Sequence, residues 1–567
     1  MKFNEFSYQR PDMQVVKTEI LNHTQALKEA SSSQEAIEAV QAIQAIQRDI
    51  ETQSTLTSIR HSIDTRDEFY SAEQDFWDEQ SPVIDEWITE YYKAVLASPY
   101  RKDLEENLPH TFFKLAELQE KVFSSEIIPL LQQENRLVSE YGKLKASAEI
   151  EYKGQTYNLS SIGAFAQSTD QEERKTVNHL ITDWYQERMD EFDRIYDELV
   201  KTRHEIALKL GFKDFVEVGY ARMARLDYDR SDVEVYREEV LKHVVPLAQK
   251  LVDRQQERLG LDKLAYYDLG LTFPKGNAKP EGSVQEIVDK AVKMYHELSP
   301  ETAEYIDILV DQELLDLESK PGKDTGGYCT SILNYDVPFI FANFNGTSHD
   351  VEVLTHEAGH GFQAYNSSWI QTPEVVWPTL ESCEIHSMSM EFLTWPWMQD
   401  FFGDQIEKFK YQHLEGAVRF IPYGVLVDHF QHEIYEHPEM TPAERRQTWR
   451  KLEKIYNPWK DYEGNEFYEN GAWWFKQLHI FVQPFYYIDY TLAQVCAFQF
   501  WKRSQIDQDP QAWQDYLAIC KVGGTQSFTE IIETGNLKSP FGKGNLADTL
   551  SSIENFLDQV DEASLRV

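Results

Sequence analysis

The segment best equipped for chemistry is 352–360, Glu-Val-Leu-Thr-His-Glu-Ala-Gly-His, which contains the pattern His-Glu-x-x-His. His356 and His360 are four residues apart, so on a helix they would project from one face, about one turn apart. Two imidazoles so placed can bind one Zn²⁺, and Glu357 beside them could take a proton from an attacking water without binding the metal. With 16 His among 567 residues, about 0.05 such patterns are expected by accident. The pattern therefore predicts one zinc ion per chain.

A catalytic zinc also needs a third protein ligand and one open position. Residues 378–391 follow the pattern and are expected to form a second helix that could supply this ligand. Glu381, Glu384, His386 and Glu391 all have suitable side chains, and residue type alone does not choose among them.

The histidine pattern needs a helix for this geometry, and the residues around it favour one. Thr347 and Ser348 are good helix caps, and Asp350 would lie in the first turn, where its charge suits the helix dipole. Gly359 costs about 1 kcal/mol inside a helix, which indicates that another segment approaches the backbone closely there. Glu352, one turn before the first histidine, could accept the second ring N–H of a ligand histidine, with a solvated helix face as the alternative.

Most of the remaining sequence is helical in character. Apolar residues at helical spacing, together with capping residues, predict helices over 12–145, over about 170–260 and from 347 onward. Ser283 and Thr441 each begin a capping box that marks a further helix start. A glycine turn predicts a β-hairpin over 149–159.

Two runs rich in aromatic and β-branched residues, 328–333 and 338–344, are predicted to be strands. The part from Phe339 to Phe344 is a candidate edge strand, and an open edge can hold an extended peptide by main-chain hydrogen bonds. An ordinary inner strand is the alternative. The residues expected to contact such a peptide are Phe341, Ala342, Asn343 and Gly346.

Composition limits the partners and the compartment. The formal charge of −41 makes nucleic acid and anionic membrane poor partners, because their phosphates are repelled. No apolar run reaches about 18 residues and the first residues lack a signal-peptide pattern, so no membrane span is predicted. Four widely spaced cysteines without a C-x-x-C pair fit reduced thiols in the cytoplasm. The oligomeric state is left open.

Two longer motifs add a family resemblance. The run 356–360, His-Glu-Ala-Gly-His, followed by 384–392, Glu-Ile-His-Ser-Met-Ser-Met-Glu-Phe, resembles the oligoendopeptidase F branch of the thimet oligopeptidase family of zinc oligopeptidases. The stretches 326–331 and 341–347 are also similar to that branch. The resemblance implies that Glu384 is the third zinc ligand.

The resemblance also implies a fold. It predicts a mainly α-helical, two-lobed ellipsoid of the zincin, gluzincin-like type, with a deep channel and a small β-sheet beside the helix that carries the histidine pattern. It covers about residues 200–560, whereas the N-terminal helices match only in character. We therefore expect an N-terminal helical region, 1–165, packed closely against a catalytic zinc-peptidase region, 166–567.

The segment 479–490 combines a histidine with several tyrosines. Its residue pattern alone indicates an amphipathic aromatic helix packed in the core. The resemblance instead implies that His479, Tyr487 and Tyr490 contact the substrate and stabilise the negative charge that develops on its carbonyl oxygen.

The expected function is that of a zinc metalloendopeptidase that hydrolyses internal bonds of short, unstructured oligopeptides, with Glu357 as the general base. Two alternatives are kept. A helical dipeptidyl carboxypeptidase has a similar interval to its third glutamate, although the residues after Glu384 do not look like that group. A non-enzymatic peptide-binding scaffold with an accidental motif would bind no zinc.

Overall fold

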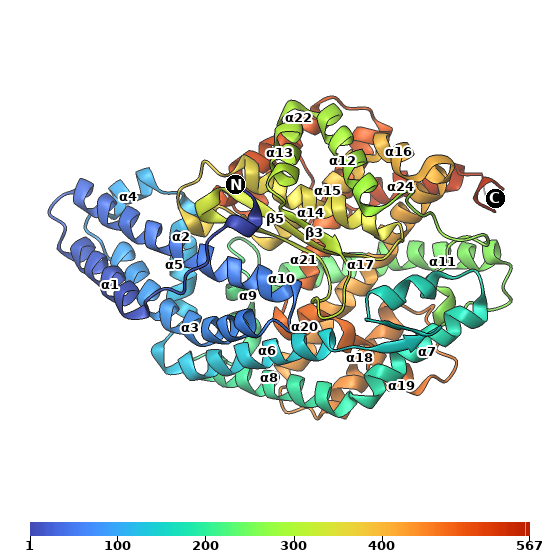
Figure 1. Ribbon diagram of the computed structural model, residues 1–567, viewed down its shortest axis with the longest axis horizontal. Coiled ribbons are helices and arrows are strands. Elements are labelled where there is room, and N and C mark those ends of the chain that lie inside the picture. The colour runs from blue at the N-terminus through green and yellow to red at the C-terminus, as the bar shows by residue number, and fades with distance from the viewer. Residues whose placement is uncertain (562, 567) are drawn as a thin grey trace.

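The computed structural model describes residues 1–561 and 563–566, and its helices surround a small sheet near the middle of the molecule (Figure 1). The helices before that sheet are α1 (Met13–Glu29), α2 (Ser33–Ile63), α3 (Glu68–Leu96), α4 (Arg101–Asn107), α5 (His110–Val122), α6 (Ile128–Ala146), α7 (Gln171–Glu187), α8 (Met189–Lys209), α9 (Phe215–Arg222), α10 (Arg230–Glu239), α11 (Val245–Leu259), α12 (Val284–Leu298) and α13 (Pro300–Asp311). The helices after it are α14 (His349–Asn366), α15 (Leu380–Leu393), α16 (Met398–Phe402), α17 (Ile406–Glu436), α18 (Pro442–Tyr456), α19 (Glu466–Glu469), α20 (Leu478–Val482), α21 (Tyr487–Trp501), α22 (Gln511–Val522), α23 (Phe528–Thr534) and α24 (Ala547–Gln559). The predicted mainly helical architecture is confirmed.

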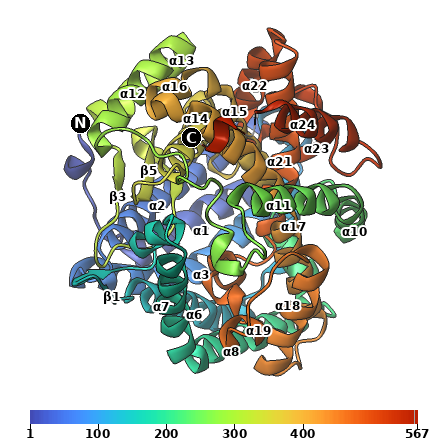
Figure 2. The same ribbon diagram turned by 90° about the vertical axis from the view of Figure 1, so that its right-hand side faces the viewer.

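Helices α14, α15 and α21 lie in the middle layer of the molecule. In the side view, α12, α13, α16 and α22 lie above this layer, and α6, α7, α8, α18 and α19 lie below it (Figure 2). Helix α15 packs against both α14 and α21, so the segments that carry the candidate site residues are neighbours in space.

The N-terminal helices have an apolar cluster of their own at one end of the long axis (Figure 1). Residues of α1, α2, α3, α4 and α5 form it, and Leu333, Ile370, Val375 and Val376 from later in the chain complete it. Leu56 and Val122 belong instead to the main core. The two parts are therefore packed together, and the division at residue 165 stays a prediction.

The strands form two small sheets. Strands β1 (Ile150–Tyr152) and β2 (Gln155–Tyr157) make the predicted antiparallel hairpin. The second sheet contains β3 (Leu315–Glu318), β4 (Tyr328–Ile332) and β5 (Val337–Phe344) in the order β3-β5-β4. Strand β5 packs against α14, as expected of a sheet beside the histidine helix. Strand β3 was not predicted.

The prediction of an edge strand at Phe339–Phe344 was wrong. Strand β5 pairs in parallel with β3 on one side and antiparallel with β4 on the other, so neither of its edges is open. Phe341 and Ala342 are fully buried, and an apolar run without alternation is typical of a strand covered on both faces. Asn343 donates hydrogen bonds to the carbonyls of Asp324 and Gly326, so it joins β5 to the loop before β4.

The helix starts follow the predicted capping chemistry. The hydroxyl of Ser32 caps α2, and complete capping boxes begin α12 at Ser283 and α18 at Thr441. At α14, Ser348 occupies the N-cap position, but its side chain makes no capping bond. The Asp350 carboxylate instead accepts the backbone N–H groups of Asn345 and Gly346, which fixes the chain entering this helix.

Gly359 explains how α14 and α15 approach each other. A Cβ atom at this position would lie 2.6 Å from the carbonyl oxygen of His386 and 2.7 Å from the Cα of Ser387. Only a residue without a side chain fits there, which confirms the predicted close approach. This contact places the two helices near enough for their side chains to share one site.

All four cysteines are free thiols, as predicted. In the part of the chain that the structure describes, no helix combines the length and apolar character needed to cross a bilayer.

Candidate metal centre and active site

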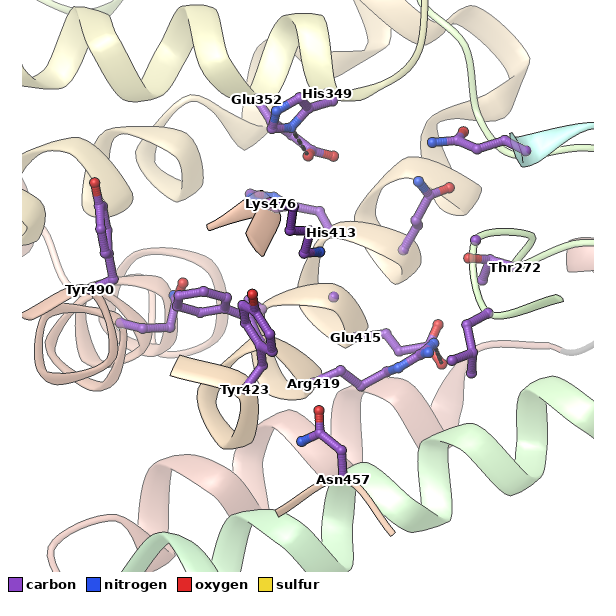
Figure 3. A pocket seen from close by; sticks show the side chains of 18 of the residues that line it. Thr272, His349, Glu352, His413, Glu415, Arg419, Tyr423, Asn457, Lys476 and Tyr490 are labelled. Atoms are coloured by element: carbon purple, nitrogen blue, oxygen red, sulfur yellow. Dashed lines mark ion pairs between the residues drawn. The ribbon is translucent and has the colours of Figure 1, made fainter. Parts of the chain in front are cut away.

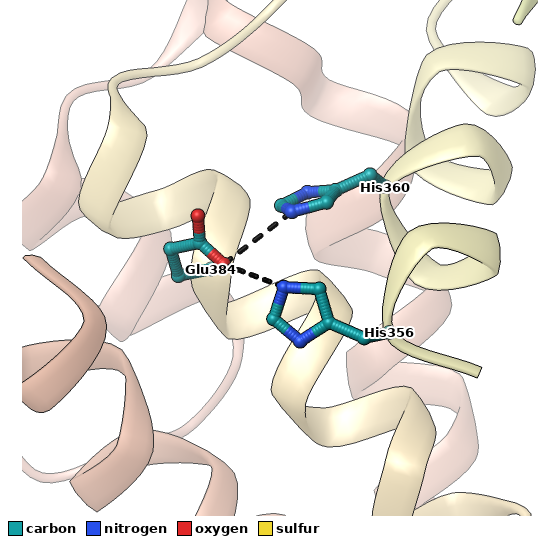
Figure 4. A group of neighbouring side chains, drawn as sticks. All are labelled: His356, His360 and Glu384. Atoms are coloured by element: carbon teal, nitrogen blue, oxygen red, sulfur yellow. Dashed lines mark ion pairs between the residues drawn. The ribbon is translucent and has the colours of Figure 1, made fainter. Parts of the chain in front are cut away.

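Two imidazoles and one carboxylate converge between α14 and α15. His356 and His360 project from α14 toward the Glu384 carboxylate of α15 (Figure 4). Glu384 Oε2 lies 3.1 Å from His356 Nε2 and 3.3 Å from His360 Nε2. Tetrahedral ligands with bonds of about 2.0–2.1 Å would be about 3.3–3.4 Å apart. The spacing of these atoms therefore suits one small cation held by all three.

The ionisation state of Glu384 also favours binding of a cation by this group. Glu384 is 1% exposed, and burial raises its pKa, but the nearby His360 and His356 outweigh burial and hold that pKa well below its usual value. An ionised carboxylate is the form that binds metal. The second Glu384 oxygen accepts a hydrogen bond from the hydroxyl of Tyr486, which fixes the orientation of the carboxylate.

Glu357 lies beside this group and lines the adjoining cavity. Its side chain is 6% exposed, and among the described residues its Oε2 has no hydrogen-bond partner. Burial raises the pKa of Glu357, and the neighbouring His356 and His360 offset part of that rise. Gly327 leaves room for the carboxylate, because a Cβ there would lie 3.3 Å from Glu357 Oε1. A buried carboxylate with an unused oxygen and a raised pKa can act as a general base.

The second ring nitrogen of His356 is held from α15 and not from its own helix. His356 Nδ1 lies 2.7 Å from Glu391 Oε1. Glu352, the predicted partner, lies instead 3.5 Å from the ring of His349. The His356 ring points across to α15, so a residue two turns after Glu384 on the same face meets its outer nitrogen. That seven-residue spacing within α15 is the signal by which the sequence could have indicated Glu391.

Glu391 itself is held by a further histidine. His413 Nε2 lies 2.7 Å from Glu391 Oε2, and Trp395 donates its indole N–H to His413 Nδ1 at 2.9 Å. Burial raises the pKa of Glu391, but its hydrogen bonds to His356 and His413 lower that pKa to about 2. Sequence reasoning treated Glu391 only as a possible metal ligand. The structure instead places its carboxylate on the outer ring nitrogen of His356, where it orients that histidine.

The other two candidates for the third metal ligand, Glu381 and His386, have different partners. Glu381 accepts a hydrogen bond from Thr379, and the His386 ring lies 3.2 Å from the carbonyl of Ile519. Neither belongs to the cluster of potential ligand atoms, which lie within 4.8 Å of one another and come from His356, His360 and Glu384 alone among the described residues.

A chain of hydrogen bonds leads to Tyr490. Tyr423 donates to Gln477 Oε1 at 2.8 Å, and Gln477 Nε2 lies 2.9 Å from His479 Nδ1. His479 Nε2 lies 3.0 Å from the Tyr490 hydroxyl. Since the Gln477 carbonyl is occupied by Tyr423, its amide must donate to Nδ1, and the neutral imidazole must carry its proton on Nε2. His479 then donates to Tyr490, which keeps its own proton for another acceptor.

Burial supports the neutral state of His479, because it lowers the pKa of this imidazole to about 4. Tyr487 also lines the cavity, with its ring centroid 5.0 Å from that of His479. Tyr486 was missed by sequence reasoning; its place directly before Tyr487 in an aromatic run was the only signal. The four side chains His479, Tyr486, Tyr487 and Tyr490 therefore form one group at the start of α21.

These residues face a cavity of about 860 Å³. Its walls include α7, α14, α15, α17, the chain between 266 and 277 and the chain between 457 and 494. Figure 3 shows several of its side chains, including Tyr490, His413 and Lys476. Of the predicted site residues, His356, Glu357, Glu352, His479, Tyr487 and Tyr490 line it. The four predicted peptide contacts on and after β5 do not line it. Gly327, directly before β4, one of the two edge strands of this sheet, does.

Known families match most of the chain. Residues 164–547 match the family described as Peptidase family M3, and residues 3–123 match the Peptidase M3 N-terminal domain. A curated oligoendopeptidase F homolog of Mycoplasma pneumoniae is 26% identical over 199 residues. That match spans 34% of this chain and 29% of the curated relative.

Solved structures match over the full length. PZ peptidase A, determined with an inhibitor, is 49% identical, with a TM-score of 0.98 over 99% of this chain and 100% of that one. A protein assigned as oligoendopeptidase F from Bacillus anthracis is 46% identical, with a TM-score of 0.93 over 99% of both chains.

Proposed function

Because this chain belongs to peptidase family M3, in its oligoendopeptidase F branch, we propose that it is a zinc-dependent endopeptidase of short, unstructured oligopeptides. The observation that carries the proposal is the convergence of His356, His360 and Glu384 beside Glu357. A metal-binding group next to an unused buried carboxylate is the arrangement that hydrolysis of a peptide bond by activated water requires.

The three donors suit zinc in number and kind. Two imidazole nitrogens and one carboxylate oxygen, with a fourth position left for water or substrate, is a ligand set that catalytic zinc takes. When bound there, zinc supplies a Lewis acid that polarises a carbonyl and lowers the pKa of water. His356, held by Glu391 on its outer nitrogen, presents Nε2 to the metal position.

The residues of the chain carry the proton and the developing charge. Glu357 accepts a proton from the attacking water and delivers it to the leaving amine. Tyr490, whose hydroxyl proton is left available by the hydrogen bond from His479, donates to the carbonyl oxygen as it becomes negative. His479 holds the Tyr490 hydroxyl in place, and Tyr486 holds the Glu384 carboxylate, each by a hydrogen bond.

The edge strand β4 is the proposed guide for an extended peptide. It pairs only with β5, and Gly327 at its start lines the cavity. Main-chain pairing suits substrates of varied sequence, because it uses no side chain of the peptide. A cavity lined by α7, α14, α15 and α17 is suited to a flexible peptide that can lie along its walls.

The test is a series of internally quenched peptides of rising length, blocked at both ends. We expect cleavage within the blocked peptides, loss of cleavage after chelation, and recovery when zinc is added. A dipeptidyl carboxypeptidase would fail on the blocked peptides. Cleavage by a preparation that elemental analysis shows to be free of metal would contradict the proposal.

A further inference from the structure

One part of the cavity wall is basic in a chain whose formal charge is −41. Lys476, Lys460 and Arg419 all line the same cavity as Glu357 and Tyr490. Figure 3 shows Lys476, Arg419 and Tyr490 among its side chains. A fourth cation lies behind them, because Lys145 Nζ donates to the backbone carbonyl of Lys476 at 2.8 Å. Cations in the wall of a cavity attract an anionic group.

Two of these cations are already paired. Lys460 Nζ lies 3.4 Å from Glu453, and Arg419 lies 3.7 Å from Glu415. Arg419 also donates to Gln255 at 2.9 Å. They therefore contribute positive charge to the wall, but each has a protein partner of its own.

Lys476 differs from them. Among the described residues, no carboxylate lies within ion-pairing distance of its ammonium, and no hydrogen bond from it is present. The ammonium lies 3.8 Å from the centroid of the Trp473 ring and 5.3 Å from that of Tyr423. Both aromatic rings also line the cavity. Ring contacts hold the side chain in one place but do not neutralise its charge.

The carboxylate of Glu453, whose charge acts on Lys476 from a distance, is already bound by other residues. Glu453 accepts hydrogen bonds from Tyr462 at 2.6 Å and from Arg450 at 3.2 Å, besides its contact with Lys460. Lys476 is partly buried and has no counter-charge of its own in the described part of the chain, so an anionic group of a ligand can pair with it. The position is also close to the reaction centre, because Tyr423 contacts Lys476 by its ring and His479 through Gln477.

We propose that Lys476, against Trp473 and Tyr423 and beside Lys460, forms a subsite that binds a carboxylate group of the peptide substrate. The carboxylate comes from the peptide C-terminus or from an aspartate or glutamate side chain. The inference rests on the proposed peptidase function, since it assigns a substrate group to the same cavity. It makes the enzyme select peptides by charge as well as by length.

The test compares two pairs of quenched peptides. One pair differs only in a C-terminal acid or amide, and the other only in Asp or Asn at one internal position, scanned along the peptide. The wild type is expected to favour the acidic member of one pair about 10- to 100-fold in kcat/KM, the range of a charge-assisted hydrogen bond. The pair that responds identifies the source of the carboxylate.

Lys476→Met keeps most of the stem against Trp473 and removes the charge. It is expected to abolish the preference by slowing the acidic peptide alone, while Lys476→Arg retains part of it. Lys451→Met is the matched control, because Lys451 is exposed on α18 outside the cavity. Thermal unfolding and zinc content of each variant separate this effect from misfolding, and Lys476→Gln replaces the methionine variant if that one unfolds.

Failure of this inference is distinguishable from failure of the proposed function. Fluorescence anisotropy of labelled acid and amide peptides on Glu357→Gln measures the preference without any cleavage. A preference there that Lys476→Met removes supports the subsite even if the wild type cuts nothing. Equal binding of both members in both pairs, or equal losses on acid and amide in Lys476→Met, would overturn it.

Discussion

His479 Nε2 lies 3.0 Å from the hydroxyl of Tyr490, and the hydrogen bond between them runs from the imidazole to the phenol. The direction follows from Gln477, whose carbonyl is taken by Tyr423 and whose amide therefore donates to His479 Nδ1. Two side chains outside the reacting atoms thus decide which way the Tyr490 proton points.

Tyr490→Phe removes the proposed donor to the carbonyl oxygen. We expect kcat to fall about 10²- to 10³-fold with little change in KM, because the donor acts mainly on the transition state. Steady-state kinetics with one quenched peptide measures both constants. Unchanged zinc content shows that the metal site is intact, and an unchanged kcat would remove Tyr490 from the mechanism.

Gln477→Met removes the hydrogen bond that determines which ring nitrogen of His479 carries the proton, and it leaves the Tyr490 side chain unchanged. We expect a smaller loss in kcat than in Tyr490→Phe, and almost no added loss when both changes are combined, because they interrupt one chain of hydrogen bonds. A double-mutant cycle on kcat measures this coupling. Losses that simply multiply in the double variant would show that Gln477 does not act through Tyr490.

Glu391→Gln weakens the support of His356. Loss of such a hydrogen-bonded carboxylate lowers metal affinity about 10- to 100-fold, which competition with a fluorescent zinc chelator measures. Glu352→Gln is the matched control, since Glu352 also lines the cavity but lies against His349. Equal effects of the two changes would contradict the roles read from the geometry.

Glu357→Gln and Glu384→Gln separate proton transfer from metal binding. The first is expected to keep zinc and lose hydrolysis by several orders of magnitude, because an amide cannot accept the proton from water. The second is expected to lose zinc as well, because a neutral amide replaces an ionised ligand. Elemental analysis beside the peptide assay distinguishes them, and full activity of Glu357→Gln would exclude it as the base.

Gly359→Ala tests the contact between α14 and α15. The added Cβ would meet the backbone of His386 and Ser387, which is expected to cost about 1–3 kcal/mol of stability. Gly416→Ala in α17 is the control, because a methyl group added there would have nothing within 4 Å and alanine favours a helix. Thermal unfolding should show a lower midpoint for the first and an equal or higher one for the second.

The preference for acidic peptides should depend on pH. Burial, and then the charges of Lys460 and Lys145, lower the pKa of Lys476 to about 7, with Glu453 opposing them. The ammonium is therefore present below pH 7 and is lost as the pH rises through that value, while a peptide carboxylate stays ionised throughout. The ratio of kcat/KM for acid and amide should fall between about pH 6 and 8 and stay flat in Lys476→Met.

Local features of this chain could be predicted without coordinates. The spacing of His356 and His360 places both on one helical face wherever α14 packs, because 3.6 residues per turn is a property of the backbone itself. The capping boxes at Ser283 and Thr441, and the turn at Gly154, also depend only on neighbouring residues. Helical content and the positions of β1, β2, β4 and β5 followed from the same short-range physics, whereas β3 was not predicted.

Contacts between elements were decided by tertiary packing alone. Glu391 and not Glu352 meets His356, because the ring points across the interface and the partner depends on how α15 lies against α14. Strand β5 has no open edge, because β3 arrives from another part of the chain. Among the described residues Lys476 has no ion-pair partner, because in the folded chain the Glu453 carboxylate contacts Lys460 and Tyr462. Such relationships join residues far apart in sequence, and no periodicity along the chain encodes the distance between them.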